Sequence, residues 1–313
     1  MLRLIASRLV AAIPVMGMVA ILVFLMLRLG PSDPALILAG DTATPEAVAA
    51  IRAGLGLDKP LWYQFLVWIG QLLSGDFGLS VFSRQPVIDM VLQRIEPTVS
   101  LAFTTLALSI VIAIPAGVLA AWRHDSWLDR LIMTFSVLGF SIPVFVLGYI
   151  FIYLFAMQMD WLPVQGFTPI GANLPNFLRQ IAMPTLALSF IYIALFARIT
   201  RSAMLEVLRE DYIRTAQAKG LPESVILVKH ALRNAAVPIV SVIGIGFALM
   251  IGGVVITETV FNIPGIGRLV VDAVLARDYP VIQGVILLLS GVYVLINLLT
   301  DIAYILLDPR IRY

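Results

Sequence analysis

The chain has 313 residues, of which 60% are hydrophobic and 13% charged, and its mean hydropathy is +0.99. Soluble domains carry roughly 25% charged residues, so this composition excludes an ordinary soluble domain and indicates a membrane protein. The net charge of +2 gives no basic field for nucleic acid, and the absence of cysteine excludes disulfides and thiolate metal sites.

The apolar residues fall in runs of about 20 residues, the length at which a helix crosses a hydrocarbon core about 30 Å thick. The first run is too long for a signal-peptide core and no A-x-A site follows it closely, so we expect an uncleaved span. The run LWYQFLVWIGQLL, Leu61–Leu73, is too short to cross and its aromatic residues suit a helix lying at the interface. We predict an all-α polytopic protein with six transmembrane helices at 9–29, 99–121, 131–157, 181–197, 237–257 and 281–307.

Lysine and arginine set the expected orientation, because cytoplasmic segments carry an excess of them. With the N-terminus inside, thirteen of the 21 fall on cytoplasmic segments and seven on outward segments, and Arg28 lies at a boundary. We therefore expect both termini in the cytoplasm. The outward segments 30–98, 158–180 and 258–280 are rich in turn signals such as GPSDP and NIPGIG, which favour structured caps.

The most polar long stretch, EDYIRTAQAKGLPESVILVKHALRN at 210–234, lies between the fourth and fifth expected spans. Spacings of three and four predict an amphipathic helix over 204–219. Its expected apolar stripe consists of Leu205, Leu208, Tyr212 and Ala216. On another face Glu210 and Arg214 form a favourable i,i+4 pair, although Glu206 and Glu210 repel each other.

A second helix is expected directly after the first. Gly220 can take the positive φ that ends a helix, and Pro222 suits the start of the next one. Helix, turn and helix would form a rigid elbow that stands clear of the lipid headgroups. A solvated connector is the alternative, but a connector needs far fewer residues, and an apolar stripe in water calls for a partner surface.

EDYIRTAQAKG, followed after nine residues by HALRNAAVP, resembles the coupling-loop signature of binding-protein-dependent ABC importer permeases. More narrowly it is similar to the B-type subunit of the dipeptide/oligopeptide subfamily. Supporting blocks cover almost the whole chain: LGLDKPLWYQF, GDFGLS, ETVFNIPGIGRLV, RDYPVIQG and DPRIRY. The resemblance implies the type I ABC importer permease fold, with a first helix and periplasmic loop over 1–93 and a core domain over 94–313. The implied coupling loop is about 198–236.

The resemblance also implies which residues couple transport to ATP hydrolysis. The broad family has Glu-Ala-Ala where this chain has Arg214, Thr215 and Ala216, a substitution typical of the peptide subfamily, as is the HALR block from His230. In place of a Pro-Gly-Asp-Pro turn the chain reads PSDP at 31–34, which leaves one turn geometry open. The implied coupling residues are Asp211, Tyr212, Arg214, Thr215, Ala216, Lys219, Gly220, Leu221 and His230.

The implied function is a non-catalytic permease subunit of an ATP-driven importer of short peptides or similar polar solutes in the bacterial inner membrane. The implied partners are a homologous C-type permease, two cytoplasmic ATPases and an extracytoplasmic solute-binding protein. The chain has no G-x-x-x-x-G-K-[ST] motif, so we expect no cofactor in it, with ATP and magnesium held by the ATPases.

An ion-coupled secondary transporter is the alternative, and it would need carboxylates at the membrane midplane. Within the expected spans only Asp301 is acidic, and we place it near the headgroups. The fifth span is rich in small residues, which we expect to serve close helix packing; a seam between two permeases and a pore wall are compatible alternatives. These residues are Gly244, Gly246, Ala248, Gly252 and Gly253.

Overall fold

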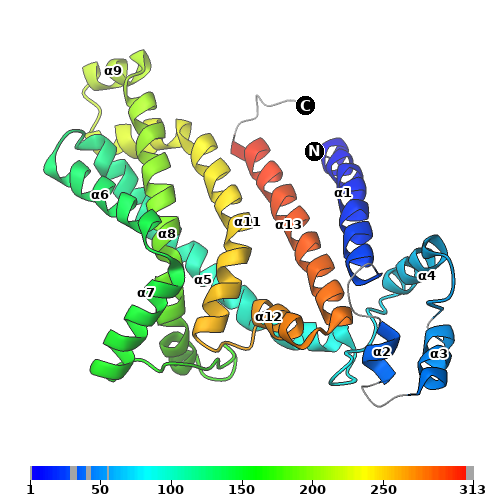
Figure 1. Cartoon of the computed structure of the whole chain (residues 1–313). Coiled ribbons are helices and arrows are strands. Elements are labelled where there is room, and N and C mark those ends of the chain that lie inside the picture. Colours follow the sequence, from blue (N-terminus) through cyan, green and yellow to red (C-terminus); the bar gives the residue numbers. More distant parts are fainter. Residues whose placement is uncertain (1, 29–33, 40–43, 55, 308–313) are drawn as a thin grey trace. The chain divides into compact units, whose positions relative to one another are not determined.

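A computed structural model describes residues 2–28, 34–39, 44–54 and 56–307 (Figure 1). Over these ranges the regular elements are helices, and one isolated β-bridge joins Leu79 to Pro86. The chain forms two compact units, of residues 1–95 with 269–294 and of residues 96–268 with 295–313. The terminal block DPRIRY and residues 31–33 of the PSDP turn lie outside the described residues.

Five expected spans are confirmed as helices long and apolar enough to cross a membrane. They are longer than the apolar runs that predicted them, because helical hydrogen bonding continues into polar sequence at either end. The five helices are α1 (Leu2–Arg28), α5 (Val87–Trp122), α8 (Leu174–Leu208), α11 (Ala236–Val260) and α13 (Tyr279–Leu307).

The third expected span, 131–157, is not one straight helix. It consists of α6 (Trp127–Ser141), α7 (Val144–Phe151) and the π-helix η1 (Ile152–Gln158), with a bend of 100° after α6. Pro143 causes the break, because a proline disfavours helical geometry in the residue before it, and Ile142 is extended at φ −101° and ψ 118°. The six expected spans are therefore five helices and one bent pair.

In the first unit, short helices follow α1: α2 (Pro34–Ala39), α3 (Pro45–Gly54) and α4 (Leu61–Leu73). The bounds of α4 are those expected. The ring of Phe24, near the end of α1, contacts Phe65 at 5.3 Å and Trp68 at 5.6 Å between centroids. The buried amide of Gln64 donates to the carbonyls of Leu57 and Lys59 at 3.2 and 2.8 Å. Aromatic packing and this amide thus fix α4 to α1 and to the turn before it.

The GDFGLS and RDYPVIQG blocks meet in the same unit. Asp278, buried just before α13, accepts hydrogen bonds from the Ser80 hydroxyl (2.5 Å) and the Val81 amide (3.2 Å). A Cβ on Gly284 would lie 2.7 Å from Val87, which shows how closely the start of α5 approaches α13. Two blocks almost 200 residues apart therefore form one packed contact.

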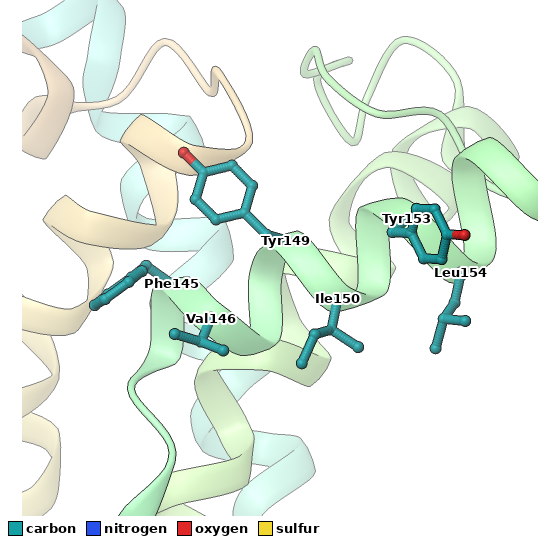
Figure 2. Close-up of a pocket in the computed structure, with 6 residues that line it drawn as sticks. All are labelled: Phe145, Val146, Tyr149, Ile150, Tyr153 and Leu154. Atoms are coloured by element: carbon teal, nitrogen blue, oxygen red, sulfur yellow. The ribbon is translucent and has the colours of Figure 1, made fainter.

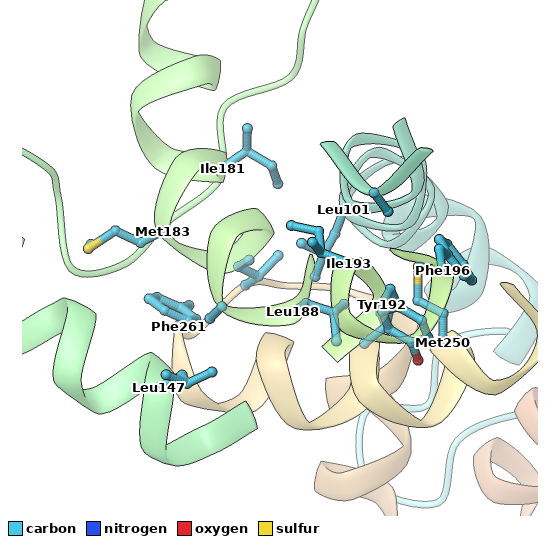
Figure 3. Packing of buried hydrophobic residues seen from close by; sticks show 14 of the residues in the cluster. Leu101, Leu147, Ile181, Met183, Leu188, Tyr192, Ile193, Phe196, Met250 and Phe261 are labelled. Atoms are coloured by element: carbon cyan, nitrogen blue, oxygen red, sulfur yellow. The ribbon is translucent and has the colours of Figure 1, made fainter. Parts of the chain in front are cut away.

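The second unit is built around α8, which packs against α6, α7 and α11. Figure 3 shows its core, where α8 contributes most of the buried side chains. The fifth-span glycines serve packing as expected at three positions, because a Cβ would collide with Thr300 at Gly244, Phe196 at Gly246 and Leu188 at Gly253. Gly252 has nothing within 4 Å, so it does not serve close packing within the described residues.

Candidate functional site

The expected helix over 204–219 is two helices. The first, α8, ends at Leu208, and α9 (Asp211–Ala218) begins after Glu210, whose backbone is extended at φ −68° and ψ 146°. Glu210 therefore precedes α9, and Arg214 pairs with Asp211 at 3.5 Å instead. Both side chains of that pair are largely exposed, so it adds little stability. In Figure 1, α9 lies beyond the end of α8.

The break changes which residues of α9 face inward. Ile213 is fully buried and Ala216 nearly so, whereas Tyr212 is 41% exposed. A continuous helix would have placed Tyr212 on the stripe of Leu208, and the break turns Ile213 inward in its place. Ile213 belongs to an apolar cluster with Ala121, Ala203, Met204, Ala216, Ile226, Ala231, Ala235 and Ile239.

Gly220 ends α9 in the conformation that the sequence predicts. Its φ is +72°, its amide donates to the Gln217 carbonyl at 2.9 Å, and the Leu221 amide donates to the Ala216 carbonyl at 3.3 Å. These two bonds form a Schellman motif, which satisfies carbonyls that a helix end otherwise leaves free. A side chain at Gly220 would meet open space but a strained backbone.

The second arm of the elbow starts at Pro222, as expected, with α10 (Glu223–Val225) running into the π-helix η2 (Ile226–Leu232). The Asn234 amide joins the two arms: it donates to the Tyr212 hydroxyl and to the His230 carbonyl, both at 2.8 Å. We name residues 209–235 the elbow.

All nine predicted coupling residues lie in the elbow, but on different surfaces of it. Ala216 is buried against the bundle, and His230 is half-buried in η2. The sequence reading missed Ile213 and Asn234, which hold the elbow together; the spacing of Ile213 and Ala216 carried a signal for the first. The other seven residues are exposed on α9 and its turn: Asp211, Tyr212, Arg214, Thr215, Lys219, Gly220 and Leu221.

An ion pair between a buried carboxylate and a partly exposed arginine fixes the helix that carries the elbow. Arg201 of α8 donates to both carboxylate oxygens of Asp129, at 2.5 and 2.7 Å, and only 4% of the Asp129 side chain is exposed. Asp129 lies in the first turn of α6, where its amide donates to the N-cap Ser126. No sequence pattern predicted this pair, because its members are 72 residues apart.

Buried carboxylates bear on the ion-coupled alternative. Those found among the described residues are Asp129, Glu258 and Asp278. Each lies at or beside a helix end and is hydrogen-bonded there. This placement differs from the midplane carboxylates that a symporter needs.

An apolar depression on α7 and η1 is lined by side chains of one helical face (Figure 2). A solute site needs polar groups converging from several elements, and this surface brings none together. Its composition fits lipid or another helix: Phe145, Val146, Tyr149, Ile150, Tyr153 and Leu154.

Solved structures support the fold. An inward-facing MetNI methionine ABC transporter has a chain that matches with a TM-score of 0.60 at 19% identity, over 71% of this chain and 97% of that one. Such low identity establishes the shared fold alone.

Curated relatives match end to end. A probable peptide ABC transporter permease of Sinorhizobium fredii is 58% identical over 309 residues, 99% of each chain. A putative peptide transport system permease of Brucella abortus is 45% identical, and a glutathione transport system permease of Escherichia coli K12 is 42% identical, each over the full length of both chains.

Family comparison gives the same result. Residues 113–313 match the binding-protein-dependent transport system inner membrane component, and residues 1–102 match the N-terminal part of such membrane components. The chain therefore belongs to the family of inner-membrane components of binding-protein-dependent transport systems, and it is a multi-pass permease subunit of an ABC importer.

Proposed function

We propose that this permease carries short peptides or similar small polar solutes into the cytoplasm, and that ATPase subunits act on it through the exposed face of α9. The solute class rests on the relatives, since those at 58% and 45% identity are named for peptide transport. The relative at 42% is named for glutathione, so selectivity within this class varies on one framework.

The observation that carries the coupling proposal is the construction of the elbow. Its inner side is anchored by Ile213 and its end is fixed by the Gly220 turn, while seven predicted coupling residues remain exposed. A short helix held this way can transmit a displacement to α8 and η2 instead of absorbing it. ATP-driven closure of the ATPases would shift the bundle between two packings, as two-state elements do.

The proposed assembly contains a homologous second permease, two cytoplasmic ATPases and an extracytoplasmic solute-binding protein, with ATP and magnesium held by the ATPases. Both termini and the elbow are cytoplasmic in this proposal, in line with the lysine and arginine distribution. Because the chain contains no cysteine, single cysteines can test it. We expect an impermeant maleimide to label K219C only from the cytoplasmic face and D160C only from the opposite face; the reverse pattern would refute the orientation.

Replacing Gly220 tests the coupling role. We expect Gly220→Val to lower ATP-dependent peptide uptake by about tenfold or more, because a β-branched residue is strained at positive φ. Gly220→Asn should retain much more uptake, since asparagine tolerates this conformation. Gly171→Val is the matched control, because Gly171 also faces open space and has no positive φ.

Uptake is measured in proteoliposomes that contain the whole complex, with assembly checked in each variant. Wild-type uptake by Gly220→Val would refute the coupling role. Accumulation by the permease alone on an ion gradient would instead support the secondary transporter.

A further inference from the structure

Glu258 is a charged residue with no solvent exposure, at the end of α11. Burying a carboxylate is costly unless hydrogen-bond donors surround it. The described donors come from two segments far apart in the chain: the Thr98 hydroxyl of α5 at 2.6 Å and the Arg268 backbone amide at 3.0 Å.

Thr98 links three segments through one oxygen. Its hydroxyl donates to Glu258, and the same oxygen accepts from the Ile266 amide at 2.8 Å. A hydroxyl has one proton and two lone pairs, so both bonds can form together. The Glu258 carbonyl also accepts from the Ile263 amide at 2.9 Å, which closes the turn between the two helices.

The carboxylate lies at the start of α12 (Ile266–Ala276), where helix amides without intrahelical partners favour a negative charge. Two glycines leave space for the Glu258 carboxylate beside the backbone. A Cβ on Gly265 or Gly267 would come closer than 3.0 Å to the Glu258 carboxylate. Gly265 is therefore explained by close approach to the buried carboxylate, and Gly267 by close approach to the Val255 backbone of α11 as well as to the carboxylate.

Two further hydrogen bonds are made by residues close in sequence to Thr98 and Glu258. The Glu96 carboxylate accepts from the Ile170 amide at 3.1 Å, and the Asn262 amide donates to the Gln165 side chain at 2.8 Å. Glu96 lies within one turn of Thr98, so this part of α5 also holds the segment before α8. These two bonds are exposed, and Glu258 provides the buried one.

We propose that Glu258 and Thr98 are positioning residues for transport: together they fix the first turn of α12 to α5, so that the part of α5 around Thr98, the end of α11 and the first turn of α12 move as one body during the transport cycle. This rests on the proposed ATP-driven function. Without the pair, ATP hydrolysis would continue, but the three segments would no longer move together and less solute would be transported per ATP.

The test compares Thr98→Val with Thr98→Ser in the complete complex. Valine keeps the shape of threonine but removes the hydroxyl that accepts from the Ile266 amide and donates to the Glu258 carboxylate, whereas serine keeps the hydroxyl. The bond from the Arg268 amide to Glu258 is present in both variants. Hydrogen exchange is measured on peptides covering 262–272. We expect exchange at Ile266 to rise about threefold to tenfold in Thr98→Val, the size expected for losing a neutral hydrogen bond, and to stay near wild type in Thr98→Ser.

Function is read in the same preparations as peptide uptake per ATP hydrolysed. We expect this ratio to fall at least fivefold in Thr98→Val while ATPase activity per assembled complex is kept, and Thr98→Ser to restore it. Glu258→Gln, which keeps the shape of the side chain, should lower the ratio in the same way if Thr98→Val assembles poorly.

Unchanged exchange in Thr98→Val would overturn the proposal, and so would a parallel loss of uptake and ATPase activity that merely follows the amount of complex. Failure of the proposed ATP-driven function would give a result different from these two outcomes. In that case the wild type itself shows no ATP-dependent uptake, while the exchange difference between the valine and serine variants remains.

Discussion

Replacing Ile213 with alanine should release α9 from the bundle without unfolding the protein. Ile213 is fully buried, and its replacement removes three carbon groups worth about 0.8 kcal/mol each, to which a cavity term is added. Alanine regains a few tenths of a kcal/mol of helix propensity. The net loss is about 2 to 4 kcal/mol, which raises the detached fraction of α9 by roughly 30-fold to 700-fold.

The size of this effect follows from the length of α9. An eight-residue helix is not stable alone, so its anchoring side chains decide whether it forms. Hydrogen exchange of residues 211–218 in the assembled complex measures the detached fraction, and peptide uptake should fall with it. Ile213→Val is the graded control, because it costs about 0.5 to 1.5 kcal/mol. Tyr212→Phe loses only a partly exposed hydroxyl bond to Asn234, so we expect a smaller change. Wild-type protection of 211–218 in Ile213→Ala would refute the anchor.

Three other outcomes are expected. Asp129→Ala should lower the melting temperature of the purified complex, because the partly exposed guanidinium of Arg201 loses two charge-assisted hydrogen bonds, at a cost of about 1.5 to 3 kcal/mol. A melting temperature within 1 to 2 °C of wild type, roughly the shift from losing well under 1 kcal/mol, would contradict this. Gly253→Val should reduce the yield of assembled complex, because a Cβ there would collide with Leu188. Gly252→Val is the control and should assemble normally, because Gly252 has open space around it. Equal yields would show that the close approach of Gly253 to Leu188 is unimportant. A variant with Trp62 as its only tryptophan should be quenched by lipids brominated near the headgroups, since Trp62 is 66% exposed on α4; resistance to quenching would place α4 away from the interface.

Much of the fold was predictable because hydrophobic length is a local property. The spans and the bounds of α4 follow from runs of apolar residues, and the turn at Gly220 follows from one glycine and a nearby proline. The resemblance of several blocks located the elbow. It did not indicate that GDFGLS and RDYPVIQG are in contact, which depends on Ser80 and Asp278 meeting across almost 200 residues.

What the sequence did not predict has three physical sources. Periodicity assumes an unbroken helix, and the break at Glu210 carries no proline or glycine, so the inward face of α9 was assigned to the stripe of Tyr212 instead of to Ile213. Long-range polar pairs leave no periodic trace, so the burial of Glu258 beside Thr98 was not predicted. The break at Pro143 was visible in the sequence, but tolerance of proline in membrane helices made a continuous span the simpler interpretation.

The bend after α6 has a consequence for how the protein enters the membrane during synthesis. The arms on either side of the bend have 15 residues each, or about 22 Å as helix, which is shorter than the hydrocarbon core. Neither arm is a self-sufficient insertion signal. Both pack on α8, which is translated after them. Stable insertion of this bent pair should therefore wait until α8 has left the ribosome, and truncation before residue 174 should leave the bent pair extractable from the bilayer.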